Sequence, residues 1–97
     1  MTYKLAFLPT AKKEWDKLDG SVRTVFKKKV LERLETPRVE SAKLRGYDDF
    51  YKIKLRDLGY RLVYEVVDDE VVIYVIAVGR RDKIYGKLAG RKAATDK

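Results

Sequence analysis

The chain has 97 residues, with 23 Lys and Arg against 15 Asp and Glu, a net charge of +8 and a pI near 9.7. This length fits one small domain over residues 1–97, and the positive charge indicates a polyanionic partner: nucleic acid first, an acidic protein second. The sequence contains no Cys and no His. This excludes disulfides and thiolate chemistry, and it removes the commonest metal ligand and the commonest acid–base group near neutral pH.

The N-terminal residues are too short and too interrupted for a signal peptide. No apolar run approaches the roughly 18 residues of a membrane-spanning helix. We therefore expect a soluble, cytoplasmic protein with no membrane association.

The first third of the chain predicts a strand and two helices. Residues 3–7 alternate and are rich in β-forming side chains, and Pro9 then favours a helix start, with the first helix over 11–18. Asp-Gly-Ser at 19–21 ends that helix and begins a second one over 22–34. An apolar stripe follows the second helix: Val22, Val25, Phe26, Val30, Leu31 and Leu34. The short connection predicts an antiparallel helical hairpin.

The rest of the chain predicts a β-meander. Residues 39–49 are interpreted as an ordered loop, and strands are expected over 51–55, 60–67 and 71–80, joined by short turns that require antiparallel neighbours. The last of these strands is apolar on both faces, which indicates a central strand covered on both sides. A short C-terminal helix is expected over 82–88 and a frayed tail over 89–97. The fold class is α+β: an N-terminal helical hairpin on one face of a four-stranded, mainly antiparallel sheet.

Alternation along these strands predicts where the charges lie. Two lysines of the strand over 51–55 alternate with Ile53 and Leu55, so they face away from the helices if these apolar residues face them. A three-residue loop over 68–70 pairs odd residues with odd residues, which places Arg81 on the side of Arg61. Four cations then converge on the face that the helices leave free: Lys52, Lys54, Arg61 and Arg81.

Each of these side chains also has an ordinary structural explanation. Lysines on an edge strand block aggregation. Arg61 can pair with Glu65 or stack on a tyrosine, and Tyr85 can be an apolar staple of the last helix. The convergence on one face is more specific than any single residue.

A cluster of Lys and Arg without His suits phosphate chemistry through positioning and charge neutralisation. In RNA the 2′-hydroxyl attacks the neighbouring phosphodiester, which requires a base, cations for the phosphorane and an acid for the leaving 5′-oxygen. Arg stays charged, whereas clustered lysines lower one another's pKa, so that one of them becomes a base. A tyrosine stacks on a nucleobase and assists proton transfer. The base is open among Lys52, Lys54 and Tyr85.

Several motifs carry a family resemblance over residues 3–85. Lys-Leu-Arg-Gly at 43–46 and Gly-Tyr-Arg-Leu-Val-Tyr at 59–64 are typical of a wider superfamily, and Tyr-Lys-Ile-Lys-Leu at 51–55 narrows it. Lys-Glu-Trp at 13–15 and Val-Gly-Arg-Arg at 78–81 also fit. On these motifs the chain resembles RelE-family toxins, the ribosome-dependent mRNA interferases of RelBE-type toxin–antitoxin pairs.

The resemblance implies cleavage of mRNA in the ribosomal A site, leaving 2′,3′-cyclic phosphate and 5′-hydroxyl ends, with no metal and no cofactor. It places the catalytic residues at Lys52, Lys54, Arg61, Arg81 and Tyr85. It places RNA or ribosome contacts at Arg45, Lys27, Lys28 and Lys29. The implied partners are a RelB-like antitoxin that wraps the domain and disturbs its C-terminal helix, the ribosome with its small-subunit rRNA and mRNA, and operator DNA in an autorepressing complex. The stretch from Arg81 to Tyr85 is shorter than in close members of the family.

Two other functions compete with this one. ParE-like toxins share the expected fold and poison gyrase without cutting RNA, and a plain RNA-binding module also fits the charge. A gyrase inhibitor has no need of the four convergent cations.

Overall fold

The computed structural model describes residues 2–88, 90 and 91. In this part of the chain, a four-stranded sheet has the strand order β1-β4-β3-β2, with β1 parallel to β4 and the other neighbours antiparallel. The elements are β1 (Lys4–Phe7), α1 (Pro9–Asp16), α2 (Gly20–Glu35), η1 (Glu40–Ala42), β2 (Phe50–Leu55), η2 (Arg56–Leu58), β3 (Tyr60–Val67), β4 (Val72–Arg80) and η3 (Ile84–Lys87). The α+β class and the mainly antiparallel sheet expected from the sequence are confirmed.

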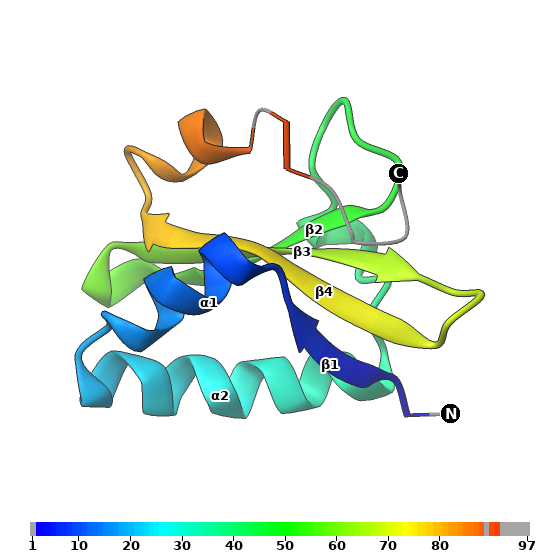
Figure 1. Ribbon diagram of the computed structural model, residues 1–97, viewed down its shortest axis with the longest axis horizontal. Helices are drawn as coiled ribbons and strands as arrows, with labels where there is room; N and C mark the ends of the chain where they lie inside the picture. Colours follow the sequence, from blue (N-terminus) through cyan, green and yellow to red (C-terminus); the bar gives the residue numbers. More distant parts are fainter. Residues whose placement is uncertain (1, 89, 92–97) are drawn as a thin grey trace.

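The elements form layers around β4, the inner strand between β1 and β3. The long helix α2 runs beneath the sheet, and the 3-10 turn η3 lies above it (Figure 1). Helix α1 lies alongside the part of β4 that β1 leaves unpaired, and there the backbone N–H of Val78 donates to Glu14 Oε1 at 3.1 Å. The expectation of a central strand covered on both faces is confirmed, since Val75, Ile76, Ala77 and Val78 are all buried.

The second helix buries a narrower stripe than its sequence predicts. Val22, Phe26 and Val30 are buried, whereas Val25 is exposed and Leu31 is 54% exposed. A helix of 3.6 residues per turn that lies along one narrow sheet covers it with a single line of side chains at every fourth position. Residues on either side of that line remain in contact with solvent.

The short C-terminal helix expected over 82–88 is present as a 3-10 helix of four residues, η3 (Ile84–Lys87). The Leu88 N–H donates an i→i+3 bond to the Tyr85 carbonyl at 3.4 Å. Gly86 within this turn disfavours a regular helix. Ile84 and Leu88 are nonetheless buried, so part of the face that was expected to be free is covered by η3. Most of the expected frayed tail lies outside the described residues.

The connection between β3 and β4 also differs from the expected three-residue loop. Val67 pairs with Val72, so the turn contains four residues, and its last residue, Val71, has φ of 57°. A register shift between Val63 and Tyr64 adds one residue to β4. Beyond the shift Arg61 is opposite Gly79, and odd residues again pair with odd ones at the end of the sheet where the cations lie.

None of the helices in the described part of the chain has the length and apolar character needed to cross a membrane.

Candidate active site

Strand β2 presents its two lysines on the face opposite α2. Ile53 and Leu55 are buried, and the alternate residues Lys52 and Lys54 are only partly buried. The antiparallel register places Lys54 directly opposite Arg61. Like charges at directly opposed positions of an antiparallel pair destabilise a sheet. The opposition of Lys54 and Arg61 is therefore unfavourable for the sheet, and the packing of the core does not require it.

The turn after β2 brings Arg81 to the same end of the sheet. Gly59 closes the turn with φ of 70°, a conformation in which a glycine has no steric penalty. The Arg81 backbone N–H donates to the Gly59 carbonyl at 2.9 Å, which extends the β3–β4 ladder by one step. Because alternate residues share a face, Arg81 lies at a register position on the face of Arg61.

Turn η3 supplies the aromatic residue of the cluster. Tyr85 is 43% exposed, and its hydroxyl accepts a hydrogen bond from Arg61 Nη1 at 2.7 Å. The Arg61 guanidinium carbon also lies 5.9 Å from the centre of the Tyr85 ring. Ile84, which is fully buried, fixes the turn next to Tyr85. The short stretch between Arg81 and Tyr85 therefore still allows Tyr85 to reach the cationic face.

The charges of the cluster act on the ionisation of Lys54. The positive charge of Lys52 lowers the pKa of Lys54, and partial desolvation and the charges of Arg56 and Arg61 lower it further. A depressed pKa increases the fraction of neutral amine near neutral pH. Lys54 is thereby favoured as the base among the three candidates.

The four other cations assigned by the family resemblance are all exposed and lie outside this cluster. Successive residues of a helix point about 100° apart, so Lys27, Lys28 and Lys29 face three directions. Lys29 reaches the margin of the site, because it lines a groove of about 580 Å³ together with Lys54 and Leu58. Arg45 lines a separate hollow of about 480 Å³ in the loop over 43–48.

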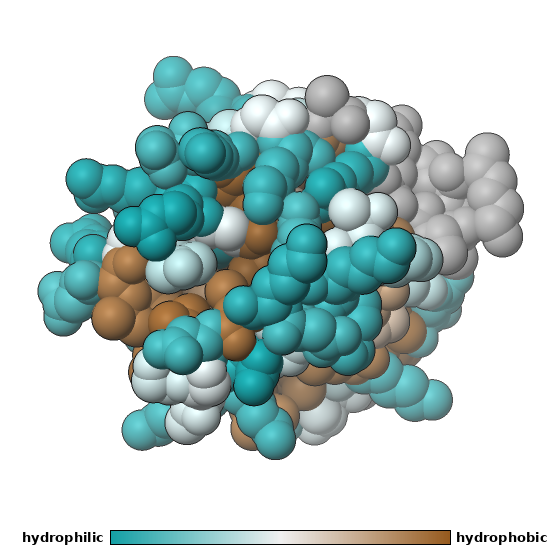
Figure 2. All heavy atoms as spheres, turned by 60° about the vertical axis from the view of Figure 1, so that its left-hand side comes forward, coloured by the Kyte–Doolittle hydropathy of each residue, from teal (hydrophilic) through white to brown (hydrophobic). Residues whose placement is uncertain are grey.

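The surface near the β2–β3 turn is mixed in character. Figure 2 shows an apolar patch bordered by long hydrophilic side chains on this side of the molecule. The apolar members of the groove beside Lys54 are Val25, Leu55 and Leu58. Single-stranded nucleic acid needs both kinds of contact, cations for its backbone and apolar surface for its bases.

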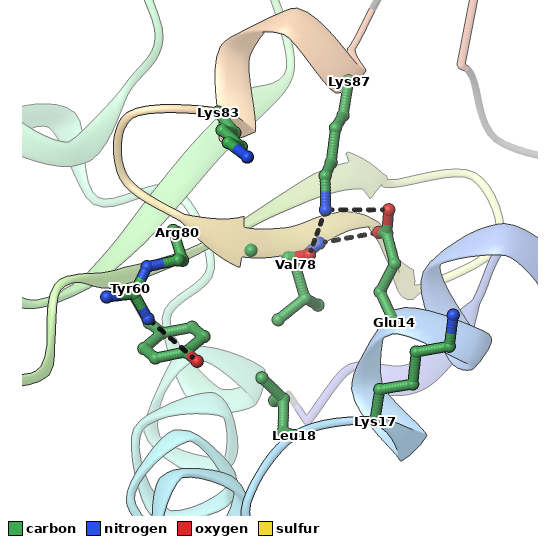
Figure 3. Close-up of a pocket in the computed structure, with 9 residues that line it drawn as sticks. Glu14, Lys17, Leu18, Tyr60, Val78, Arg80, Lys83 and Lys87 are labelled. Atoms are coloured by element: carbon green, nitrogen blue, oxygen red, sulfur yellow. Dashed lines mark hydrogen bonds and ion pairs between the residues drawn. The ribbon is translucent and has the colours of Figure 1, made fainter.

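A second hollow next to the cluster was not expected from the sequence. It has a volume of about 380 Å³ and lies between α1, the end of β4 and η3 (Figure 3). Arg80 lies against Tyr60 on one side, with its guanidinium carbon 5.2 Å from the ring centre. Glu14 and Lys87 lie on the other side, 3.2 Å apart. These contacts join residues distant in sequence, which no local periodicity reveals.

Carboxylates do not gather in this region. Within the described residues, no three Asp, Glu, His or Cys side chains lie close enough together to hold a metal ion.

Comparison with known proteins shows which family the chain belongs to. A family model described as ParE toxin of type II toxin–antitoxin system, parDE, matches residues 5–85. The mRNA interferase toxin RelE of Escherichia coli strain K12 is 57% identical over 83 residues, which cover 86% of this chain and 87% of that protein. The chain belongs to the RelE toxin family. The family resemblance found in the sequence is thereby confirmed.

Solved structures of RelE have the same fold as this chain. A mutant of E. coli RelE in the free state superimposes with a TM-score of 0.85 at 52% identity, covering 92% of this chain and 96% of that one. RelE in the intact E. coli RelBE toxin–antitoxin complex gives a TM-score of 0.79 at 58% identity, covering 80% and 95%. The roles of the individual site residues stay predictions.

Proposed function

We propose that this RelE-family chain is the toxin of a type II toxin–antitoxin pair and acts as an endoribonuclease, an mRNA interferase. The observation that carries the proposal is the cationic face itself: Lys54 opposes Arg61 across β2 and β3, and Arg61 holds the Tyr85 hydroxyl at 2.7 Å. The 57% identity to a protein named mRNA interferase toxin RelE supports the same activity.

The cluster contains the groups that RNA cleavage by the 2′-hydroxyl requires. Lys54, whose pKa is lowered mainly by Lys52, takes the proton from the 2′-hydroxyl. The 2′-oxygen then bonds to phosphorus as the bond from phosphorus to the 5′-oxygen breaks. A charged side chain of the cluster gives a proton to the leaving 5′-oxygen, which yields 2′,3′-cyclic phosphate and 5′-hydroxyl ends.

The other members of the cluster support this reaction. Lys52, Arg61 and Arg81 neutralise the charge that develops on the phosphorane. Tyr85, with its partly exposed ring, stacks on a nucleobase beside the scissile phosphate. DNA lacks the 2′-hydroxyl and is not a substrate.

The proposed setting is the A site of a translating ribosome in the cytoplasm. Exposed cations support this: Lys27, Lys28 and Lys29 would contact small-subunit rRNA, and Arg45 the RNA near the cut. A RelB-like antitoxin is the proposed protein partner, since E. coli RelE is found in the RelBE complex. With the antitoxin and operator DNA, the toxin would form an autorepressing complex.

Primer extension on a defined mRNA, with and without programmed ribosomes, tests the activity. We expect a cut within the A-site codon only when ribosomes are present. Cleavage of naked RNA at an equal rate would contradict the ribosome-dependent mechanism. The double variant Arg61→Ala/Arg81→Ala tests the site, because cleavage at the wild-type rate would show that the site lies elsewhere.

The name of the matching family model supports one alternative, a ParE-like inhibitor of gyrase. In that case the purified toxin blocks DNA supercoiling by gyrase and leaves ribosome-bound mRNA intact. The two assays, run on the same preparation, separate the functions.

A further inference from the structure

Glu14 of α1 is the centre of an ion-pair cluster that holds the C-terminal segment against the sheet. Its side chain is only 17% exposed. Arg91 forms a two-pronged bond with it, with Nη1 at 3.0 Å from Oε1 and Nη2 at 3.1 Å from Oε2. Lys87 Nζ lies 3.2 Å from Oε2 (Figure 3). Oε1 also accepts the Val78 backbone N–H at 3.1 Å.

The same cations bind the backbone of β4. Lys87 donates to the Val78 carbonyl at 3.2 Å, and Arg91 donates to the Ile76 carbonyl at 3.1 Å. Among the residues that the structure describes, β1 pairs only with Val72–Val75 of β4, so these backbone groups belong to a stretch of edge without a neighbouring strand there. Side chains of α1 and the C-terminal segment therefore satisfy backbone groups that a longer β1 would otherwise satisfy.

A glycine makes room for this arrangement. A Cβ atom built on Gly79 would lie 2.8 Å from Lys87 Nζ, so any side chain there would displace the lysine. Gly79 is also the cross-strand partner of Arg61. The path of Lys87 over β4 is thus adjacent to the cationic face.

The ionisation of Glu14 favours the cluster at neutral pH. Burial acts to raise the pKa of Glu14, but hydrogen bonds from Arg91, Val78 and Lys87 outweigh it and hold the pKa below the usual value for Glu. The carboxylate is therefore charged where the toxin works, and both cations have a charged acceptor.

The geometric consequence concerns Tyr85, which lies two residues before Lys87 on the same turn, η3. The buried Ile84 holds one end of this turn, and Glu14 holds the other end through Lys87 and Arg91. Between these two anchors Tyr85 meets Arg61. We propose that Glu14 is a positioning residue for Tyr85: by anchoring the C-terminal segment it keeps the Tyr85 ring where RNA binds. The proposal rests on the proposed ribonuclease function.

The test is Glu14→Gln, which keeps the size of the side chain and removes its charge. We expect the single-turnover rate at saturating ribosome–mRNA complex to fall about tenfold, because a misplaced group loses most of its effect while binding surfaces elsewhere are unchanged. The concentration for half-saturation stays the same. Asp16→Asn is the matched control: it removes a carboxylate of the same helix whose partner is Lys12, at 2.7 Å, on the exposed side.

A double-mutant cycle with Tyr85→Ala separates positioning from a merely structural role. If Glu14 acts through Tyr85, then Glu14→Gln has no further effect on the rate in the Tyr85→Ala background. An equal loss in both backgrounds overturns the proposal, as does a wild-type rate for Glu14→Gln. Thermal melting of each variant accompanies the rates.

Gly79→Ala provides a second variant if Glu14→Gln does not fold. It displaces Lys87 and leaves the bonds from Arg91 and Val78 to Glu14, so we expect a smaller loss that again vanishes in the Tyr85→Ala background. A wild-type rate for Tyr85→Ala removes the assigned role of Tyr85 and this inference with it. Failure of the ribonuclease function itself is distinguishable, because the wild-type toxin then cuts no mRNA on ribosomes.

Discussion

Arg61 and Tyr85 are 24 positions apart in the chain, and their side chains meet at 2.7 Å between Nη1 and the hydroxyl oxygen. The guanidinium donates a hydrogen bond to the hydroxyl and also lies over the ring. This contact restricts the rotamers of both side chains. Strand β3 and turn η3 thereby define one pre-organised corner of the site.

Removing either arginine of the site should abolish cleavage. Arg61→Ala and Arg81→Ala each delete a fixed positive charge near the phosphorane, and we expect losses of about 100-fold or more in the single-turnover rate. Neither side chain is part of the core, so the midpoint of thermal unfolding and antitoxin binding should change little. Lys12→Ala, which removes one positive charge from α1, should cut at nearly the wild-type rate. A retained rate in both arginine variants would falsify the assignment.

The lowered pKa of Lys54 gives a pH signature. A general base must be neutral, so the rate rises with pH until the pKa of Lys54 is passed. Lys52→Gln removes the largest cause of the lowered pKa. The rising limb of the curve of cleavage rate against pH should therefore move to higher pH. Arg56→Gln removes a smaller cause and should shift the limb less, in the same direction.

Single-turnover cleavage of ribosome-bound mRNA, measured from pH 6 to pH 9, gives both profiles. Lys54→Gln serves as the reference, because the limb should disappear in it. Identical limbs in the wild type and in Lys52→Gln would show that Lys54 is not the base.

Local patterns allowed the sequence to predict much of this site. Lys52 and Lys54 alternate with Ile53 and Leu55, and alternation within one strand depends only on backbone geometry. The position of Arg61 relative to β4, in contrast, does not depend on a local pattern. It follows from two departures that offset each other: a four-residue turn in place of three, and the register shift between Val63 and Tyr64. The expected face is correct only because both occur.

Contacts between distant parts of the chain had no sequence signal. Glu14 and Arg91 are 77 positions apart, and nothing in the periodicity of α1 distinguishes Glu14 from a solvated charge. The short helix expected over 82–88 is a 3-10 helix of four residues, with Ile84 at its start and Leu88 directly after it. Their burial against the sheet is satisfied equally well by a short 3-10 turn.

The hydroxyl of Tyr64 links the core to the end of α2. It is fully buried, donates to the Pro37 carbonyl at 2.6 Å and accepts from Arg33 Nη1 at 2.9 Å. Tyr64→Phe leaves this buried carbonyl without its donor, and we expect a loss of about 1–3 kcal/mol in the free energy of unfolding. Urea denaturation measures the loss. Tyr74→Phe is the control. The Tyr74 hydroxyl donates to Glu70 in an exposed contact, so its removal should lower the free energy of unfolding much less. Equal losses in the two variants would contradict this account.

Arg38 joins three separate segments on the side of the sheet away from the catalytic cluster. It donates to Asp68 at 2.8 Å, to Asp49 at 3.0 Å and to the Tyr51 hydroxyl at 3.2 Å. The Tyr3 hydroxyl also donates to Asp68, at 2.6 Å. These bonds connect the start of β1, the loop after α2, the start of β2 and the β3–β4 turn. Several charges in one network stabilise more than isolated surface pairs do.

This network predicts how stability depends on pH. The hydrogen bonds from Tyr3 and then from Arg38 hold the pKa of Asp68 below its usual value. A folded-state pKa below the unfolded one contributes stability above about pH 4, and this contribution is lost as the pH falls through the folded-state pKa. Asp68→Asn should therefore lower the free energy of unfolding at pH 7 by about 0.5–1 kcal/mol, a modest value because the side chain is 52% exposed.

Urea denaturation at pH 7, 5 and 3 checks this prediction. The difference between the wild type and Asp68→Asn should be present at pH 7 and pH 5 and should shrink at pH 3, which lies below the ordinary pKa of an aspartate. Asp69→Asn removes the same charge from the same turn without touching Arg38 or Tyr3, and we expect a smaller difference with no such pH dependence. If the two variants behave alike across this range, the stabilisation comes from the net charge of the turn, because Asp68 and not Asp69 accepts the bonds that Tyr3 and Arg38 donate to this turn.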